Sequence, residues 1–360
     1  MMNSLKISIA IVLFSCMLGC QKEAQVSEQT VSNLSATNRS TITVPAGSVN
    51  ALAAAVAAAG SGGTVILKAG EHTESGTITI PYTLALTGEP GAVLRMATTP
   101  STNNWALEPQ VVEPVLHFKN ASGLLLEGLT IKTPDTAPGN TGILIENSDQ
   151  FRIQNCQIEN HQTGMVVVRS SNGRIENCKV LGSTAWLDGD FTVAYGINMV
   201  SGNHNFLLRN EASGHGAGIF GSGKNGFMQK NDLHDNATGI ILCTFPKEFF
   251  ELPGGERVQA EYSAHAWKVS DNITHNNFED GILVIDGANA NVLIDNNSFD
   301  NGTYDINLTG DLPDYFHLTF PPSKNNLVKS LKYRDVRIKD CGTRNNIIGG
   351  KEVDYTLDPC

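Results

Sequence analysis

The feature that most constrains the fold is one short pattern that recurs between Gly142 and Phe299. In each copy a glycine leads an apolar run and an asparagine follows. The glycines are 22, 32, 22, 21 and 42 residues apart, and the asparagines are 22, 33, 21, 45 and 21 residues apart. The two sets are Gly142, Gly164, Gly196, Gly218, Gly239 and Gly281, and Asn155, Asn177, Asn210, Asn231, Asn276 and Asn297. A period of about 22 residues with short β-rich runs predicts the stacked coils of a solenoid, with the asparagines at its tight turns.

The composition fits many tight turns rather than long surface helices. Of the 360 residues, 17% are charged and 35 are glycine. The net charge of -11 argues against nucleic acid as a partner, because phosphate binding needs a basic surface. The charge is uneven, since residues 324–351 hold eight Lys or Arg against Asp335 and Asp340 and are therefore +6. Such a segment is either solvated or binds anions.

The N-terminus carries an export signal. Lys6 precedes an apolar run, residues 7–18, that is too short to span a bilayer comfortably. The run ends in Met17-Leu-Gly-Cys20, which resembles a bacterial lipoprotein signal peptide. This resemblance implies cleavage before Cys20, lipid on its sulfur, and location in the bacterial cell envelope; an ordinary signal peptide cut nearby is the alternative. Residues 21–41 are polar and predict a flexible tether.

Residues 48–60 predict a helix that covers the first coil of the solenoid. Ser48 is the expected N-cap, an alanine-rich body follows, and Gly60 ends the helix. β-rich runs broken by Gly and Pro turns come next, at residues 64–67, 78–80, 84–86 and 93–96.

This opening resembles that of exported right-handed parallel β-helix proteins, the superfamily that contains the pectate lyases. The resemblance extends over about residues 43–310. It implies an all-β right-handed parallel β-helix of about eight to nine coils with an N-terminal capping helix. The expected division is a β-helix over residues 42–310 and a C-terminal tail or cap over residues 311–360.

The cysteines fit an oxidising compartment. Cys156 and Cys178 follow two of the repeat asparagines at one offset, so we expect them in neighbouring coils. They are either small buried thiols or a disulfide. Cys341 with Cys360 is an equally plausible disulfide.

Two insertions interrupt the repeat. About ten extra residues lie between Asn177 and Gly196, and about 24 lie between Gly239 and Asn276. Because both flank the same face, they predict a cleft with walls at residues 183–194 and 244–267 and with the glycine-led strands as its floor.

The predicted walls are rich in residue types that suit sugars. Aromatic faces stack on the C–H faces of sugar rings, and carboxylates accept hydrogen bonds from the hydroxyls. The candidate substrate-binding residues are Trp186, Asp188, Asp190, Phe249, Glu251, Arg257 and Trp267. The alternative is that these aromatics fasten the loops to the coils. Asp188 and Asp190 could hold a calcium ion, and no other cofactor is indicated.

The predicted floor is apolar. Strand alternation turns Leu144, Val166, Asn198, Phe220, Ile241 and Leu283 outward. A catalytic floor needs acids, bases or cations, so either a loop covers this face or the site lies elsewhere.

Three family resemblances bear on catalysis. Gly214-His215-Gly216 and Arg337-Ile-Lys339 resemble stretches of pectin-hydrolysing β-helices, although the paired aspartates of those enzymes have no counterpart here. The run that starts at Tyr195-Gly-Ile resembles a mannuronan epimerase motif in its tyrosine and glycine. This resemblance implies Tyr195 as proton donor, with His215 or Lys224 nearby. Residues 195–242 are most similar to exported NosD-like β-helix repeat proteins of unassigned role, which offer no catalytic residues to transfer.

The sequence therefore predicts an exported lipoprotein, expected to be a monomer, that binds and modifies a polysaccharide. The expected chemistry is that of a lyase or epimerase acting on uronic-acid glycans, by proton transfer at the carbon next to the carboxyl group. The alternative is a non-catalytic binding or assembly protein of the cell envelope. The histidines stand at different offsets in the repeat, so a metal site is not indicated.

Overall fold

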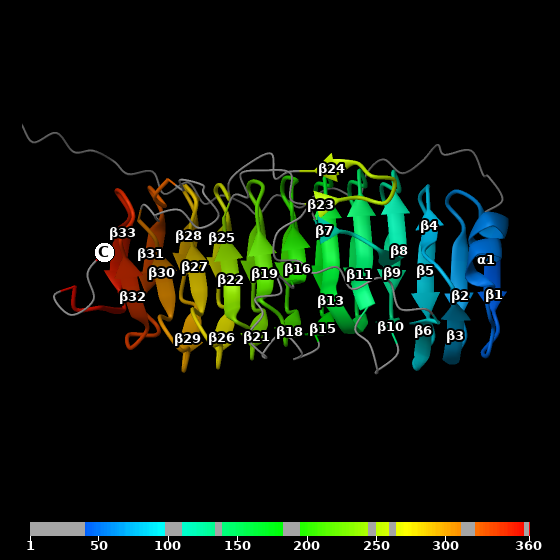
Figure 1. Ribbon diagram of the computed structural model, residues 1–360, viewed down its shortest axis with the longest axis horizontal. Coiled ribbons are helices and arrows are strands. Elements are labelled where there is room, and N and C mark those ends of the chain that lie inside the picture. Colours follow the sequence, from blue (N-terminus) through cyan, green and yellow to red (C-terminus); the bar gives the residue numbers. More distant parts are fainter. Residues whose placement is uncertain are drawn as a thin grey trace, which may run out of the picture. The chain divides into compact units, whose positions relative to one another are not determined.

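The computed structural model describes residues 40–97, 110–133, 139–182, 195–243, 250–258, 264–310, 321–355 and 360. In this part of the chain, short parallel strands pair coil upon coil (Figure 1). A typical coil contributes one strand to the first sheet and two strands to the second, and these sheets are here called sheet 1 and sheet 2. This arrangement confirms the predicted parallel β-helix.

Sheet 1 has one strand from each coil. Its strands are β1 (Thr41–Val44), β2 (Thr64–Leu67), β5 (Ala85–Gly88), β9 (Leu125–Glu127), β12 (Arg152–Gln154), β14 (Arg174–Glu176), β17 (Phe206–Leu208), β20 (Phe227–Gln229), β25 (Lys268–Ser270), β28 (Val292–Ile294), β31 (Leu327–Ser330) and β33 (Asn346–Gly349).

Sheet 2 has two runs of strands that meet at a corner. The first run is β3 (Gly70–Glu74), β6 (Ala92–Met96), β10 (Thr130–Lys132), β15 (Lys179–Gly182), β18 (Glu211–Ser213), β21 (Asp232–His234), β26 (Ile273–His275) and β29 (Asn297–Phe299). The second run is β4 (Ile78–Ile80), β8 (Pro114–Lys119), β11 (Gly139–Glu146), β16 (Tyr195–Met199), β19 (Ala217–Gly221), β22 (Thr238–Leu242), β27 (Ile282–Val284), β30 (Ile306–Leu308), β32 (Arg337–Asp340) and β34 (Lys351–Glu352). The long strand β13 (Gln157–Val168) crosses the corner and belongs to both runs.

The stack is longer than the sequence indicated. Sheet 1 contains twelve strands in the described residues, more than the eight to nine coils expected. β31 pairs with β28 and β32 pairs with β30, so the coils continue past residue 310, the boundary expected from the sequence. The outermost coils lack the glycine-led pattern, which is why a count of that pattern missed them.

A short helix, α1 (Leu52–Ala59), packs against β1, β2 and β4 at the N-terminal end of the stack, as predicted. The start of the helix differs from the prediction. Val49 forms a β-bridge with Thr73, and the Ser48 side chain accepts no hydrogen bond from the first turn of the helix. Glu74 takes the capping role from a neighbouring coil, since its carboxylate accepts a hydrogen bond of 2.9 Å from the Leu52 N–H. The end is as predicted: Gly60 has a φ of 68° and donates to the Val56 carbonyl.

The inward side chains form one continuous apolar core between the sheets. The row after the glycines, Ile143, Met165, Ile197, Ile219, Ile240 and Ile282, is fully buried.

Among the described residues, no helix is long and apolar enough to cross a bilayer.

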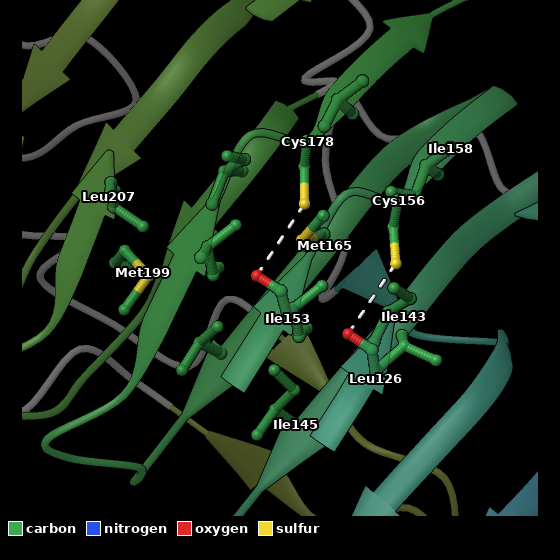
Figure 2. Packing of buried hydrophobic residues seen from close by; sticks show 14 of the residues in the cluster. Leu126, Ile143, Ile145, Ile153, Cys156, Ile158, Met165, Cys178, Met199 and Leu207 are labelled. Carbon is green, nitrogen blue, oxygen red and sulfur yellow. Dashed lines mark hydrogen bonds between the residues drawn. The ribbon is translucent and has the colours of Figure 1, made fainter. Parts of the chain in front are cut away.

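Buried asparagines form a hydrogen-bonded ladder at the turn between sheets 1 and 2. Asn210, Asn231, Asn272 and Asn296 stack there. Cys156 and Cys178 occupy the same row in the preceding coils, where their thiols point at the Leu126 and Ile153 carbonyls (Figure 2). Both cysteines are buried free thiols, and Cys341 forms a disulfide with Cys360.

The repeat asparagines divide among several structural rows. Asn155, Asn177 and Asn276 are exposed turn residues in the left-handed region, with φ of 55°, 53° and 52°. Asn297 lies in β29. Of the six asparagines named from the sequence, only Asn210 and Asn231 belong to the buried ladder. Sequence spacing did not separate these rows, because their positions within a coil differ by only one or a few residues.

A glycine packed against the largest buried side chain gives the first testable prediction. A Cβ at Gly226 would lie 2.1 Å from the Cζ3 atom of Trp267, which is 1% exposed. We expect Gly226→Ala to lower the free energy of unfolding by about 1–3 kcal/mol, because the ring must move within a packed core. Urea unfolding monitored by circular dichroism measures the change. The matched control is Gly76→Ala, where no heavy atom lies within 4 Å, and equal losses in both variants would contradict the prediction.

Candidate functional site

The floor of the predicted cleft is largely covered. β7 (Gln110–Val111), β23 (Phe250–Glu251) and β24 (Arg257–Val258) form a small sheet above the second run of sheet 2 (Figure 1). Below it Leu144, Val166 and Phe220 are at most 2% exposed and cluster with Leu252 and Val258. The described residues 250–258 of the second insertion therefore lie on the floor. The prediction of an open cleft there is wrong, and the alternative that a loop covers this face is confirmed. The small sheet removes the apolar side chains of Leu144, Val166 and Phe220 from water, and this burial stabilises its position on the floor.

The small sheet is held in place by pairing and charge. The Val112 N–H donates to the Glu251 carbonyl at 2.9 Å, and Arg169 lies 2.7 Å from Glu256. Glu251 and Arg257, both predicted to bind substrate, pair with each other across the hairpin at 3.5 Å. These two side chains thus have a structural role in the cover.

Trp267 is not at the surface. It belongs to the main core, and its indole N–H donates to the Gly223 carbonyl at 3.2 Å. The prediction that it stacks on a sugar is therefore wrong, since the ring fills the space that Gly226 leaves open.

Several predicted residues lie outside the described part of the chain. They are Cys20, Trp186, Asp188, Asp190 and Phe249. Their roles stay predictions, and with them the calcium ion. Among the described residues, no group of three or more His, Cys, Asp or Glu side chains is arranged to hold a metal ion.

The predicted catalytic residues are only partly brought together. Tyr195 stands beside Ala217 in the next coil, and His215 precedes that residue by two positions. Lys224 lies beyond the other end of β19, in the turn that leads to sheet 1. The first two residues therefore share a corner, and Lys224 does not join them.

Burial limits what Tyr195 and His215 can do. They are 2% and 1% exposed, and the Tyr195 ring packs edge-on against Phe220 at 5.0 Å. Burial raises the pKa of Tyr195 well above its usual value and lowers the pKa of His215 to about 3. Both are therefore neutral at pH 7.

The outward face becomes polar toward the C-terminal coils. The outward row of side chains that begins with Leu144 continues from coil to coil through Ile241 and Leu283. Its next two members are polar, Asn307 and Lys339. Asp280, Tyr304, Asn307 and Lys339 come together there; we call them the polar cluster. Tyr304, Asn307 and Lys339 are half-buried, whereas Asp280 beneath them is 5% exposed. Polar groups at this depth could meet a ligand and still be held in place.

The Asp280 carboxylate is fixed by two donors. The Tyr304 N–H donates to Oδ1 at 3.0 Å, and the Asn307 amide donates to Oδ2 at 2.9 Å. Burial nevertheless raises the pKa of Asp280 to about 6, although these hydrogen bonds lower it. A carboxyl group with such a pKa changes its protonation state near neutral pH, as a general acid or base must.

A cation and a phenol stand beside this carboxylate. The Lys339 ammonium lies 3.2 Å from the Tyr304 hydroxyl and 5.0 Å from the centre of its ring. The ammonium can bind an anion, and the hydroxyl can donate or accept a proton next to it. Base, proton donor and cation are thus within one cluster.

Sequence reasoning missed most of this cluster. Lys339 was noted through Arg337-Ile-Lys339, whereas Asp280 and Tyr304 were not. The available signal was the glycine row itself, because Asp280 precedes Gly281 as Tyr195 precedes Gly196. Extending that comparison one coil further, to Tyr304-Asp305-Ile306, would have shown that the outward face turns polar.

The raised pKa of Asp280 predicts a change of stability with pH. Its value in the folded chain, about 6, exceeds the ordinary 3.8, so the folded state binds more protons between these values. Stability should therefore fall as pH rises from about 4 to about 6, by up to about 3 kcal/mol from this group. Urea unfolding at several pH values measures this slope. We expect Asp280→Asn to have a flatter slope than wild type, and identical slopes would contradict the assignment.

Comparison with known proteins identifies the family of the chain. The family model described as "Right handed beta helix region" matches residues 117–315. A search of curated protein sequences found no match.

Solved structures share the fold at low identity. The A-module of the Azotobacter vinelandii mannuronan C-5 epimerase AlgE4 is 16% identical, with a TM-score of 0.53 over 85% of this chain and 92% of that one. Pectate lyase Pel9A is 12% identical, with a TM-score of 0.51 over 88% and 78% of the two chains. The Dettilon tailspike protein is 14% identical, with a TM-score of 0.53 over 86% and 68%. At such identities the likeness shows the fold alone.

Proposed function

The chain belongs to the right-handed β-helix family, and on that premise we propose that it binds an acidic polysaccharide and acts on it as a lyase or epimerase. The observation that carries the proposal is the polar cluster, where a carboxyl group with a pKa of about 6 stands beside a phenol and an ammonium. Similar folds in the mannuronan epimerase and the pectate lyase support the substrate class.

The cluster suits proton transfer next to a carboxylate. In uronic-acid sugars the reaction begins with removal of the proton on the carbon that carries the carboxyl group. Lys339 would pair with that carboxylate and with the negative charge that develops on it, which lowers the barrier. Asp280 and Tyr304 would serve as base and acid. A proton donated by Tyr304 to the opposite face of the carbanion gives the epimer. If instead the bond from the adjacent carbon to the glycosidic oxygen breaks and that oxygen takes the proton, the chain is cleaved and an unsaturated end forms. In both cases Asp280 keeps the abstracted proton.

Export as a lipoprotein anchored through Cys20 is part of the proposal. The signal-like segment ending at Cys20 supports it, and so does the disulfide between Cys341 and Cys360, because disulfides persist in oxidising compartments. Incorporation of labelled palmitate in wild type, and its loss in Cys20→Ala, would test the anchor.

Activity is tested with the chain lacking residues 1–20, incubated with alginate, pectate and glycosaminoglycans. Absorbance of unsaturated ends near 235 nm reports lyase action, and proton NMR reports epimerised residues. Either product, lost on replacing Asp280 by Asn, supports the proposal. Binding to one of these polymers without any product would instead identify a non-catalytic binding protein of the cell envelope, the alternative function.

A further inference from the structure

A cavity lies where the first run of sheet 2 ends. In the described residues β29 pairs with β26, and residues 332–337 line a pocket together with β29. Between them is a cavity of about 470 Å³, lined by Asn297–Asp300, Asp305 and Lys332–Arg337. We call it the terminal pocket. It is separate from the polar cluster.

An aromatic ring borders the terminal pocket. Phe299 is 39% exposed and stacks on His275, with ring centres 5.2 Å apart and planes 4° from parallel. His275 stacks in turn on His234 at 5.1 Å. One face of Phe299 is thus occupied by the preceding coil, and the ring meets the cavity at the last rung of this stack. A large apolar ring held at a pocket wall is a typical platform for the C–H face of a sugar.

The pocket also holds charges of both signs. Arg337 and the buried Asp305 neutralise each other, because the Arg337 backbone N–H and its Nε atom bind the Asp305 carboxylate at 2.8 and 3.3 Å. Lys332 and Arg334 remain, opposed by Asp300 and Asp335 in the lining, and Asp271 and Asp295 also act on Lys332. Lys332 lies 4.8 Å from the Tyr333 ring centre.

The surroundings of the pocket are basic. Residues 324–351 carry a net charge of +6 in a chain whose total is -11, and these residues form the last coils. A positive segment on an acidic protein attracts anions. Residues 332–337 of this segment, which the sequence predicts to be either solvated or anion-binding, line the terminal pocket.

We infer that the terminal pocket is a binding subsite for one carboxylated sugar unit of an acidic polysaccharide. Lys332 and Arg334 pair with its carboxylate, Phe299 packs on its ring, and Asp300 and Asp335 accept hydrogen bonds from its hydroxyls. This inference rests on the proposed function and adds a subsite away from the reacting groups. Arg337 and Lys339 are two residues apart on β32, about 7 Å, so one oligosaccharide can reach both sites.

The test measures binding apart from turnover. Isothermal titration calorimetry is done with hexasaccharides of mannuronate, guluronate and galacturonate, and with the same sugars reduced to neutral form. We expect Lys332→Gln/Arg334→Gln to weaken binding of one or more uronate hexasaccharides at least tenfold, to flatten the salt dependence of its Kd, and to leave the neutral forms unchanged. Phe299→Ala should weaken the uronate and its neutral form alike, about three- to tenfold.

The matched control is Lys324→Gln/Arg344→Gln, which removes the same charges from exposed positions of the basic segment outside the pocket. It should change the Kd less than threefold. Equal losses in both double variants would overturn the inference, since they would show long-range attraction only. Unchanged binding in the pocket variant, or no binding of any hexasaccharide by wild type, would overturn it as well. Pocket-dependent binding without product would sink the lyase or epimerase proposal and keep the subsite.

Discussion

Tyr304→Phe is expected to lower kcat/KM on the responsive polysaccharide by about 10²–10⁴-fold, the range that loss of a general acid or base produces. The substitution removes only the hydroxyl that lies 3.2 Å from the Lys339 ammonium. The Tyr304 backbone N–H still donates to Asp280, so the carboxylate keeps that partner. Initial rates over a range of substrate concentrations measure the effect, and the loss should fall on kcat rather than KM.

Two further variants make this result specific. Tyr82→Phe removes one hydroxyl that donates to the Val56 carbonyl at the N-terminal end, and it should keep its rate within about twofold. Tyr195→Phe tests the residue that the epimerase resemblance implies. If Tyr195→Phe abolishes activity while Tyr304→Phe retains it, the site lies at the covered corner and the assignment to the polar cluster fails.

Asn272→Ala is expected to lower the free energy of unfolding by about 3–5 kcal/mol, the largest effect on stability proposed here. The Asn272 amide nitrogen donates to the Met228 carbonyl at 3.0 Å and to Asn296 Oδ1 at 2.9 Å. Its oxygen accepts from the backbone and the side chain of Asn231. The side chain is fully buried, so truncation leaves several buried polar groups without partners.

The control for this prediction is Asn276→Gly. Asn276 is exposed and has a φ of 52°, a conformation that glycine adopts at no steric cost. Its stability should stay within about 0.5 kcal/mol of wild type. Urea midpoints compare the two variants, and a loss below 1 kcal/mol for Asn272→Ala would show that water replaces the ladder contacts.

Much of the architecture could be predicted because its causes are local. A glycine is needed at Gly142 because a Cβ there would lie 2.6 Å from the Gly164 carbonyl oxygen of the next coil. The same need recurs in each glycine-led coil, from Gly142 to Gly281, and gives the period. Likewise an alanine-rich segment ending at Gly60 predicted a helix, and the helix formed. Its N-cap was wrong because Glu74, a coil away, supplies the acceptor.

The repeat in the sequence determined that this chain stacks as a parallel β-helix, which side chains face its core, and where insertions leave the coils. Only the tertiary structure decided which part of the outward face is open. β7 pairs with β23 although they are 140 residues apart in sequence, and together with β24 they cover Leu144, Val166 and Phe220. The same face stays half-exposed at Tyr304, Asn307 and Lys339. Insertion lengths show that a loop leaves the stack, but the direction it takes depends on the apolar area it can bury, and that area belongs to distant coils.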